Sequence, residues 1–204
     1  DITDNVKTLT CVNFTQKPQE TGLWDGSSIL INVEKVKSIH TVSYQLQEDM
    51  AQMVSGCLLE EKKSEKRFWF FVLHLKSDGS KWHGSLESIR VRQTELFLNR
   101  CKKLKPSNLP IVVVGDLNSD RNMHDSFETQ GRLHVLSAFR NHGFKNTLPT
   151  QTTYNHFRQA MFDYILVKGN LKCISSFIPT LTTKKACPNK DQGSDHLPVY
   201  ATLE

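Results

Sequence analysis

Apolar and polar residues alternate along most of this chain with the period of two that is typical of β-strands. This alternation, together with many β-branched and aromatic residues, predicts strands over residues 7–14, 27–33, 36–46, 53–59, 68–75, 111–114, 161–167, 172–179 and 197–203, with further β-structure at 152–154. Polar stretches separate these segments, and the densely charged residues 60–66 are typical of a solvated hairpin loop. The chain is therefore expected to be rich in β-structure.

Two stretches follow the helical period instead. Over residues 85–105, apolar positions recur every three or four residues, with Glu87 near the beginning and three lysines near the end, as the helix dipole favours. Gln93 falls on the apolar face of this helix, and we interpret it mainly as a structural tie to the sheet, because a buried amide must be hydrogen-bonded. A second helix is predicted over residues 132–141. Strands joined both by hairpins and by crossover helices indicate an α/β fold of mixed sheets packed together, with helices outside.

The composition describes an ordinary globular protein, and its 204 residues fit a single domain, 1–204. A net charge of +5 is compatible with a polyanionic partner such as nucleic acid, although it is no dedicated basic coat. Five scattered cysteines without a Cys-x-x-Cys spacing indicate neither a disulfide framework nor a zinc site, which predicts an intracellular location, in the cytoplasm or nucleus. No apolar run approaches the length of a membrane span, and the N-terminus is no signal peptide. Because the first residue is not Met, we expect a fragment or a processed product.

Polar side chains with catalytic chemistry stand at or near the ends of four predicted strands. They are His74, Asp116 with Asn118, Asp163, and Asp195 with His196. Each alone has an ordinary explanation, since Gly-Asp-x-Asn is good turn chemistry and a single histidine is commonly a satisfied core residue. Together they describe a site. Carboxylate and amide oxygens are the ligands that Mg²⁺ prefers, and imidazoles can move protons or stabilise a charged phosphoryl oxygen.

Six short motifs give this interpretation a direction. In chain order they are His74-Leu75-Lys76-Ser77, Arg90-x-x-Gln93, Gly115-Asp116-Leu117-Asn118-Ser119, Thr152-Thr153-Tyr154, Phe162-Asp163-Tyr164-Ile165 and Ser194-Asp195-His196-Leu197. Together they resemble the endonuclease/exonuclease/phosphatase superfamily, which has the DNase I-like fold, and the first and fourth look most like its deadenylase and nocturnin branch. The resemblance implies a four-layer α/β sandwich, two packed mixed β-sheets flanked by helices, that hydrolyses phosphoester bonds with Mg²⁺ or alternatively Mn²⁺.

The resemblance also implies a role for each candidate residue. In the family, the residue matching His196 pairs with the acid matching Asp163 and helps to activate water. The match to Asp116 orients or deprotonates the nucleophile, and the matches to Asn118 and His74 contact the scissile phosphate. Asp195, Asp116 and Asn118 are the candidate metal ligands, and the residue matching Asp195 supports either the metal or the pair formed by His196 and Asp163.

Two family features are not found in this sequence. Members carry an opening strand with an Asn, followed by a Leu-Gln-Glu element whose Glu is a principal Mg²⁺ ligand. Gln47-Glu48 looks like that element, but it follows the landmarks Lys17-Pro18 and Gly26, which come after it in the family, so we reject Glu48 as the ligand. We therefore expect an N-terminally incomplete domain, without its first strand and helix, that binds Mg²⁺ weakly and turns over slowly or not at all unless the upstream segment is supplied.

Several functional hypotheses follow. The leading one is a Mg²⁺-dependent nuclease or phosphodiesterase that acts on RNA 3′ ends or on a nucleotide, with RNA a better candidate than DNA. A phosphomonoesterase with the same site is the nearest alternative, and a catalytically impaired protein that only binds phosphate-containing ligands is another. A serine hydrolase is disfavoured, because the sequence has no Gly-x-Ser-x-Gly motif.

Overall fold

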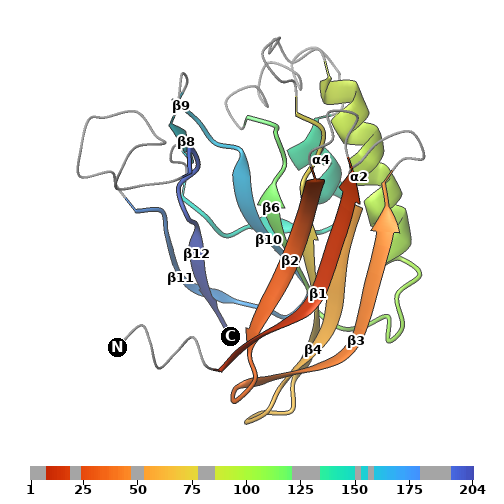
Figure 1. The fold of residues 1–204 in the computed structure, drawn as a ribbon, viewed down its shortest axis with the longest axis vertical. Coiled ribbons are helices and arrows are strands. Elements are labelled where there is room, and N and C mark those ends of the chain that lie inside the picture. Colours follow the sequence, from red (N-terminus) through yellow and green to blue (C-terminus); the bar gives the residue numbers. More distant parts are fainter. Residues whose placement is uncertain are drawn as a thin grey trace.

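A six-stranded mixed sheet is the centre of the molecule (Figure 1). The computed structural model describes residues 8–18, 24–46, 53–77, 86–120, 134–149, 153–155, 159–179 and 194–204. In spatial order the strands are β3 (Val36–Gln45), β4 (Met53–Glu61), β5 (Arg67–Leu73), β6 (Ile111–Asp116), β10 (Asp163–Lys168) and β7 (Lys145–Asn146). Strands β5 and β6 are parallel, whereas the other neighbours are antiparallel. A parallel pair needs a long crossover, and α2 (Glu87–Cys101) lies within it.

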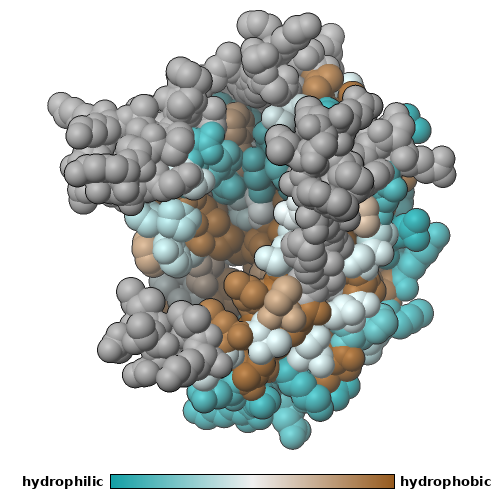
Figure 2. Space-filling view, viewed as in Figure 1, coloured by the Kyte–Doolittle hydropathy of each residue, from teal (hydrophilic) through white to brown (hydrophobic). Residues whose placement is uncertain are grey.

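Three two-stranded ribbons accompany this sheet in the described part of the chain. They are β1 (Leu9–Pro18) with β2 (Trp24–Asn32), β8 (Tyr154–Asn155) with β9 (Gln159–Ala160), and β11 (Cys173–Phe177) with β12 (Tyr200–Leu203). The β1–β2 ribbon packs on β4, where Ile29 and Ile31 contact the cluster that contains Cys57 and Leu59. In the view of Figure 2, the surface of the molecule is hollowed between the β1–β2 and β11–β12 ribbons, and hydrophobic residues lie in the hollow.

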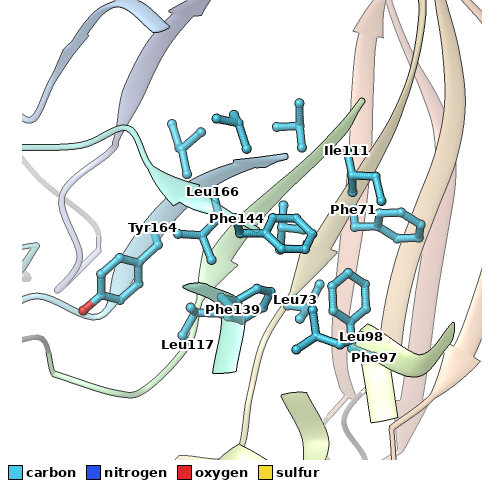
Figure 3. Close-up of a cluster of buried hydrophobic side chains, with 14 of the residues drawn as sticks. Phe71, Leu73, Phe97, Leu98, Ile111, Leu117, Phe139, Phe144, Tyr164 and Leu166 are labelled. Atoms are coloured by element: carbon cyan, nitrogen blue, oxygen red, sulfur yellow. The ribbon is translucent and has the colours of Figure 1, made fainter. Parts of the chain in front are cut away.

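Strand β5 shows how one segment serves two packed layers. Side chains of a strand alternate between the two faces of its sheet. Residues 68, 70 and 72 contact the cluster under the β1–β2 ribbon, whereas residues 69, 71 and 73 are buried in the main core. In that core Phe71 meets Phe97 of α2 edge to face at 5.3 Å, and Phe97 lies 6.0 Å from Phe139 of α4 (Val135–Asn141) (Figure 3). The two helices thus cover the face opposite the β1–β2 ribbon.

The fold class expected from the sequence is confirmed, an α/β protein with a large mixed sheet and few helices. The last strand begins later than predicted, at Tyr200 instead of Leu197, because the Leu197 amide donates to the Thr153 carbonyl at 2.7 Å and so leaves the β11 ladder. The second helix also begins later, at Val135, since His134 has extended backbone and caps it. Ser85, Thr152 and Gln47-Glu48 lie outside the described residues. No described helix is long and apolar enough to cross a membrane.

Candidate active site

Three of the candidate residues lie at one edge of the central sheet. The carboxyl ends of the parallel strands β5 and β6 share that edge, and β10 runs antiparallel to β6, so its amino end lies there too. His74 directly follows β5, Asp116 ends β6, and Asp163 begins β10. Asp163 and Asp116 are direct partners in the strand register. Strand polarity alone therefore brings together residues that are far apart in the sequence.

The end of β6 and the turn that follows it each contain a residue with an unusual backbone conformation. Gly115 has a φ of +133°, and a Cβ at this position would lie 2.0 Å from the carbonyl oxygen of Leu73, so only glycine allows the two strands to approach so closely. Asn118 has a φ of +49°, in the left-handed region that Asn tolerates better than most residues. Its backbone N–H donates to Asp116 Oδ1 at 2.7 Å, and its side-chain Nδ2 donates to the Leu75 carbonyl at 3.0 Å. The turn thereby fixes both the Asp116 carboxylate and the Asn118 amide.

His196 reaches the same edge from the segment that leads into β12. Its Nδ1 lies 2.7 Å from Asp163 Oδ2, a hydrogen bond of charge-assisted length. Thr153 holds both partners in place. Its hydroxyl oxygen accepts the backbone N–H groups of Phe162 and Asp163 at 2.9 and 3.1 Å, and its carbonyl accepts the N–H of Leu197. The side chain of Thr153 is fully buried, so it aligns the pair from inside the protein.

The Asp116 carboxylate is the electrostatic centre of the site. Its Oδ2 lies 3.8 Å from the Nε2 atoms of both His74 and His196. Burial, together with the negative charge of Asp163, raises the pKa of Asp116 to about 6, although the two histidines and the Asn118 amide oppose the shift. Because this value lies near neutrality, Asp116 can gain and lose a proton under ordinary conditions.

The pKa of the His196 imidazole is raised, which keeps the side chain protonated. Burial alone lowers the pKa of its imidazole, but the hydrogen bond and charge of Asp163, with the charges of Asp116 and Asp195, outweigh burial and raise the pKa to about 9. At neutral pH the imidazolium is therefore the main form. An imidazolium can donate a proton or supply a positive charge.

The expected metal ligands are only partly brought together. Asp116 and Asn118 belong to one hydrogen-bonded turn, and Asp195 acts on the site as a negative charge beside His196. Among the described residues there is no group of three or more His, Cys, Asp or Glu side chains that could hold a metal ion. Mg²⁺ is, however, commonly held by one or two carboxylates plus substrate phosphates, and it keeps several waters. The oxygen donors of Asp116 and Asn118 fit such a weak, water-rich site.

Sequence reasoning missed a buried polar cluster behind the site. Glu87 appears in the sequence as an ordinary acidic residue of a first helical turn, yet it is 4% exposed. It accepts hydrogen bonds from Arg90, from the Ser119 hydroxyl and from the backbone N–H of Val135. His134 lies 3.0 Å from the same hydroxyl. The only sequence signal was the three-residue spacing of Glu87 and Arg90, which is common on exposed helices as well.

An ionisable carboxylate beside a protonated imidazole, at the rim of a mixed sheet, defines a class of site suited to acid–base hydrolysis. The chain belongs to the endonuclease/exonuclease/phosphatase family, whose family model matches residues 12–196. Members of this family are phosphoesterases or nucleases and generally use divalent metal ions, so phosphoester hydrolysis is the class of reaction supported for this chain. A comparison with curated proteins finds no match.

Solved structures with the same fold are distant in sequence. A mannosyl-6-phosphatase of Bacteroides thetaiotaomicron has a TM-score of 0.72 and 19% identity, over 97% of this chain and 77% of that chain. The catalytic domain of human nocturnin with a bound sulfate anion has a TM-score of 0.70 and 19% identity, over 100% and 75%. ANGEL2, a 2′,3′-cyclic phosphatase in complex with adenosine-2′,3′-vanadate, has a TM-score of 0.71 and 17% identity, over 100% and 77%. At these identities the likeness shows the fold.

Proposed function

We propose that this chain hydrolyses phosphodiester bonds at RNA 3′ ends or in a nucleotide, with Mg²⁺ as its metal. The observation that carries the proposal is the row Asp163, His196, Asp116, in which the imidazole lies 2.7 Å from one carboxylate and 3.8 Å from the other. Such a row holds one group that can accept a proton near neutral pH and one that can donate a proton. Hydrolysis of a phosphodiester needs both, because water must lose a proton and the leaving alcohol must gain one.

In this mechanism Asp116 is the base. Its carboxylate takes a proton from water as the water oxygen forms a bond to phosphorus. The bond between phosphorus and the leaving oxygen breaks, and His196 donates its Nε2 proton to that oxygen. Asp163 keeps Nδ1 paired throughout. Proton transfer from Asp116 to His196 through one bridging water, since Oδ2 and Nε2 are 3.8 Å apart, then restores the starting state.

Asn118 and His74 are assigned to the phosphate. The carbonyl of Leu75 fixes the Asn118 amide, and an amide nitrogen has a second hydrogen that can be donated to a phosphoryl oxygen. His74 stands on the other side of Asp116, and 42% of its side chain is exposed, so a solute can reach it. Asp116 and Asn118, with Asp195 nearby, would hold Mg²⁺, which would neutralise charge on the phosphoryl oxygens.

Two features support an RNA or nucleotide substrate. The net charge of +5 attracts polyanions, and the ligand of the ANGEL2 structure is an adenosine derivative. The likeness to a mannosyl-6-phosphatase supports a phosphomonoesterase as the second candidate.

A substrate panel tests the proposal. The wild type and Asp116→Asn are assayed with Mg²⁺ and with EDTA on an RNA oligonucleotide, a 2′,3′-cyclic nucleotide, AMP and mannose 6-phosphate. We expect Mg²⁺-dependent turnover of one of the first two by the wild type only. If only AMP or mannose 6-phosphate is hydrolysed, the protein is a phosphomonoesterase, the second candidate. Turnover that survives EDTA, or no turnover of any substrate, would contradict the proposal.

A further inference from the structure

The buried cluster behind the site has two arms, and each arm holds one of the segments that carry phosphate-facing residues. In the first arm, Arg90 donates from Nη1 to the Lys76 carbonyl at 3.1 Å, and Gln93 accepts the Lys76 N–H at 3.0 Å. Lys76 is two residues beyond His74. The N–H and the carbonyl of Lys76 are thus both fixed by α2. Gln93 is a structural tie, as interpreted, but it holds the segment after β5 and not the sheet itself.

The second arm holds the segment after β6. The Ser119 hydroxyl, one residue beyond Asn118, lies 2.8 Å from Glu87 Oε1 and 3.0 Å from His134 Nε2. His134 Nδ1 accepts the N–H of Leu136, so its proton is on Nε2, and the chain of donors runs from His134 to Ser119 to Glu87. The Ser119 carbonyl also accepts the Tyr164 hydroxyl at 2.9 Å.

The two arms meet in the Glu87 carboxylate. Oε2 accepts a hydrogen bond from Arg90 Nε at 2.9 Å, and Oε1 accepts hydrogen bonds from the Ser119 hydroxyl and from the Val135 N–H. Glu87, Arg90, Ser119 and His134 are between 0% and 4% exposed, so none of them can touch a substrate. A buried ion pair is seldom a better source of stability than apolar packing, but it fixes geometry because its hydrogen bonds have direction.

We propose that Glu87, with Arg90, Gln93, Ser119 and His134, is a positioning cluster that sets the spacing between His74 and Asn118 for a phosphoryl group. This inference rests on the proposed function, since it assigns those two residues to the phosphate. A displacement of about 1 Å in such a pair lowers turnover by as much as about 100-fold.

Three variants separate positioning from stability. Ser119→Ala removes the hydroxyl that links His134 to Glu87, and Gln93→Met removes the acceptor of the Lys76 N–H at nearly unchanged volume. Thr94→Val is the matched control. Its position is fully buried beside Gln93 on α2, and within the described part of the chain its hydroxyl donates only to the helical carbonyl of Arg90, at 2.8 Å.

We expect Ser119→Ala and Gln93→Met each to lower kcat about 10- to 100-fold with a change in KM below about threefold, and Thr94→Val to keep kcat within about twofold. Amide hydrogen exchange gives a readout that needs no activity. In Ser119→Ala the N–H of Asn118 should exchange at least about tenfold faster, while the N–H of Val113 within β6 keeps its rate.

The outcomes are distinguishable. Equal kcat losses in all three variants, or faster exchange throughout the sheet, would overturn the positioning role and leave a structural one. If the wild type hydrolyses none of the phosphoesters, the proposed function fails, and the exchange rate of Asn118 alone then decides whether the cluster fixes that turn. If either Ser119→Ala or Gln93→Met fails to fold, the other variant still tests the positioning role in its own arm of the cluster.

Discussion

Replacing Asp116 with Asn should stabilise the protein while it removes turnover. The carboxylate has a pKa of about 6 in the folded protein, compared with an ordinary value of 3.8. The folded state therefore binds this proton more tightly than the unfolded state does. The stability that the protonated carboxyl contributes is present below pH 3.8 and is lost as the pH rises from 3.8 to about 6. At neutral pH the ionised Asp116 side chain therefore destabilises the fold.

The size of the effect follows from the pKa difference. Each pKa unit corresponds to about 1.4 kcal/mol, so the free energy of unfolding is lower by about 3 kcal/mol when Asp116 is ionised. An Asn side chain carries no charge, and its oxygen can still accept the Asn118 N–H that now donates to Oδ1. New contacts between its NH₂ group and the imidazoles offset part of the gain. We expect a net gain of about 1–3 kcal/mol, which raises Tm by about 2–4 °C for each kcal/mol in a protein of this size.

The assay is thermal unfolding in EDTA at pH 7.5 and at pH 4.5. Asp116→Asn should have the higher Tm at pH 7.5, and the advantage should fall to less than half at pH 4.5, where the wild-type carboxyl is protonated in the folded state. Glu34→Gln, in an exposed turn, is the control and should change Tm little at either pH. An Asp116→Asn variant that is no more stable than the wild type at pH 7.5, or equally favoured at both pH values, would refute the reasoning.

Three further outcomes are expected. In the pH profile of kcat/KM, the upper limb should come from deprotonation of His196, whose pKa is raised by its pairing with Asp163, and Asp163→Asn should move that limb to lower pH. An unchanged upper limb would contradict the pairing. Thr153→Val should lower the free energy of unfolding by about 2 kcal/mol and reduce kcat, whereas Thr153→Ser, which keeps the hydroxyl, should restore kcat. Equal kcat values for Thr153→Val and Thr153→Ser, measured without denaturant, would show that the hydroxyl does not align the site. Gly115→Ala should lower the free energy of unfolding measured in urea by several kcal/mol or prevent folding, because its Cβ would overlap the Leu73 carbonyl. Near-normal urea unfolding would exclude that clash.

The sequence was sufficient to place the main site residues on one edge of the sheet. The apolar runs within residues 68–75 and 111–114 form β5, which ends at Leu73, and β6, because few other structures bury such runs. The polar residues at the end of each run therefore lie at the carboxyl edge of a parallel pair. The Gly-Asp-x-Asn pattern was also readable as turn chemistry, although β6 continues through Gly115 to Asp116 before the chain turns. The amino end of β10 could be added only through strand pairing, which the order of motifs indicated but periodicity did not.

Other features depend on contacts that no local pattern encodes. Glu87 is joined to Ser119, 32 residues away, and to Val135, 48 residues away, so its burial could not be read from the first turn of a helix. The start of β12 was predicted too early, because the alternating residues from Leu197 fit a strand equally well until the bond to Thr153 is known. The raised pKa of His196 likewise depends on the charges of Asp163, Asp116 and Asp195, which outweigh the effect of burial.

The charges of the site give a reason for a cation that is independent of family membership. With Asp116 and Asp163 as carboxylates and His196 as an imidazolium, these three groups carry a net charge of about −1, and two unit charges 4 Å apart interact by about 4 kcal/mol near a protein surface. A phosphate therefore needs further positive charge beside Asp116. If Mg²⁺ supplies it, the ion also relieves the destabilisation caused by ionised Asp116, so Mg²⁺ should raise the Tm of the wild type at pH 7.5 and leave that of Asp116→Asn nearly unchanged. Calorimetric unfolding with and without Mg²⁺ measures this, and equal shifts in both proteins would place the ion away from Asp116.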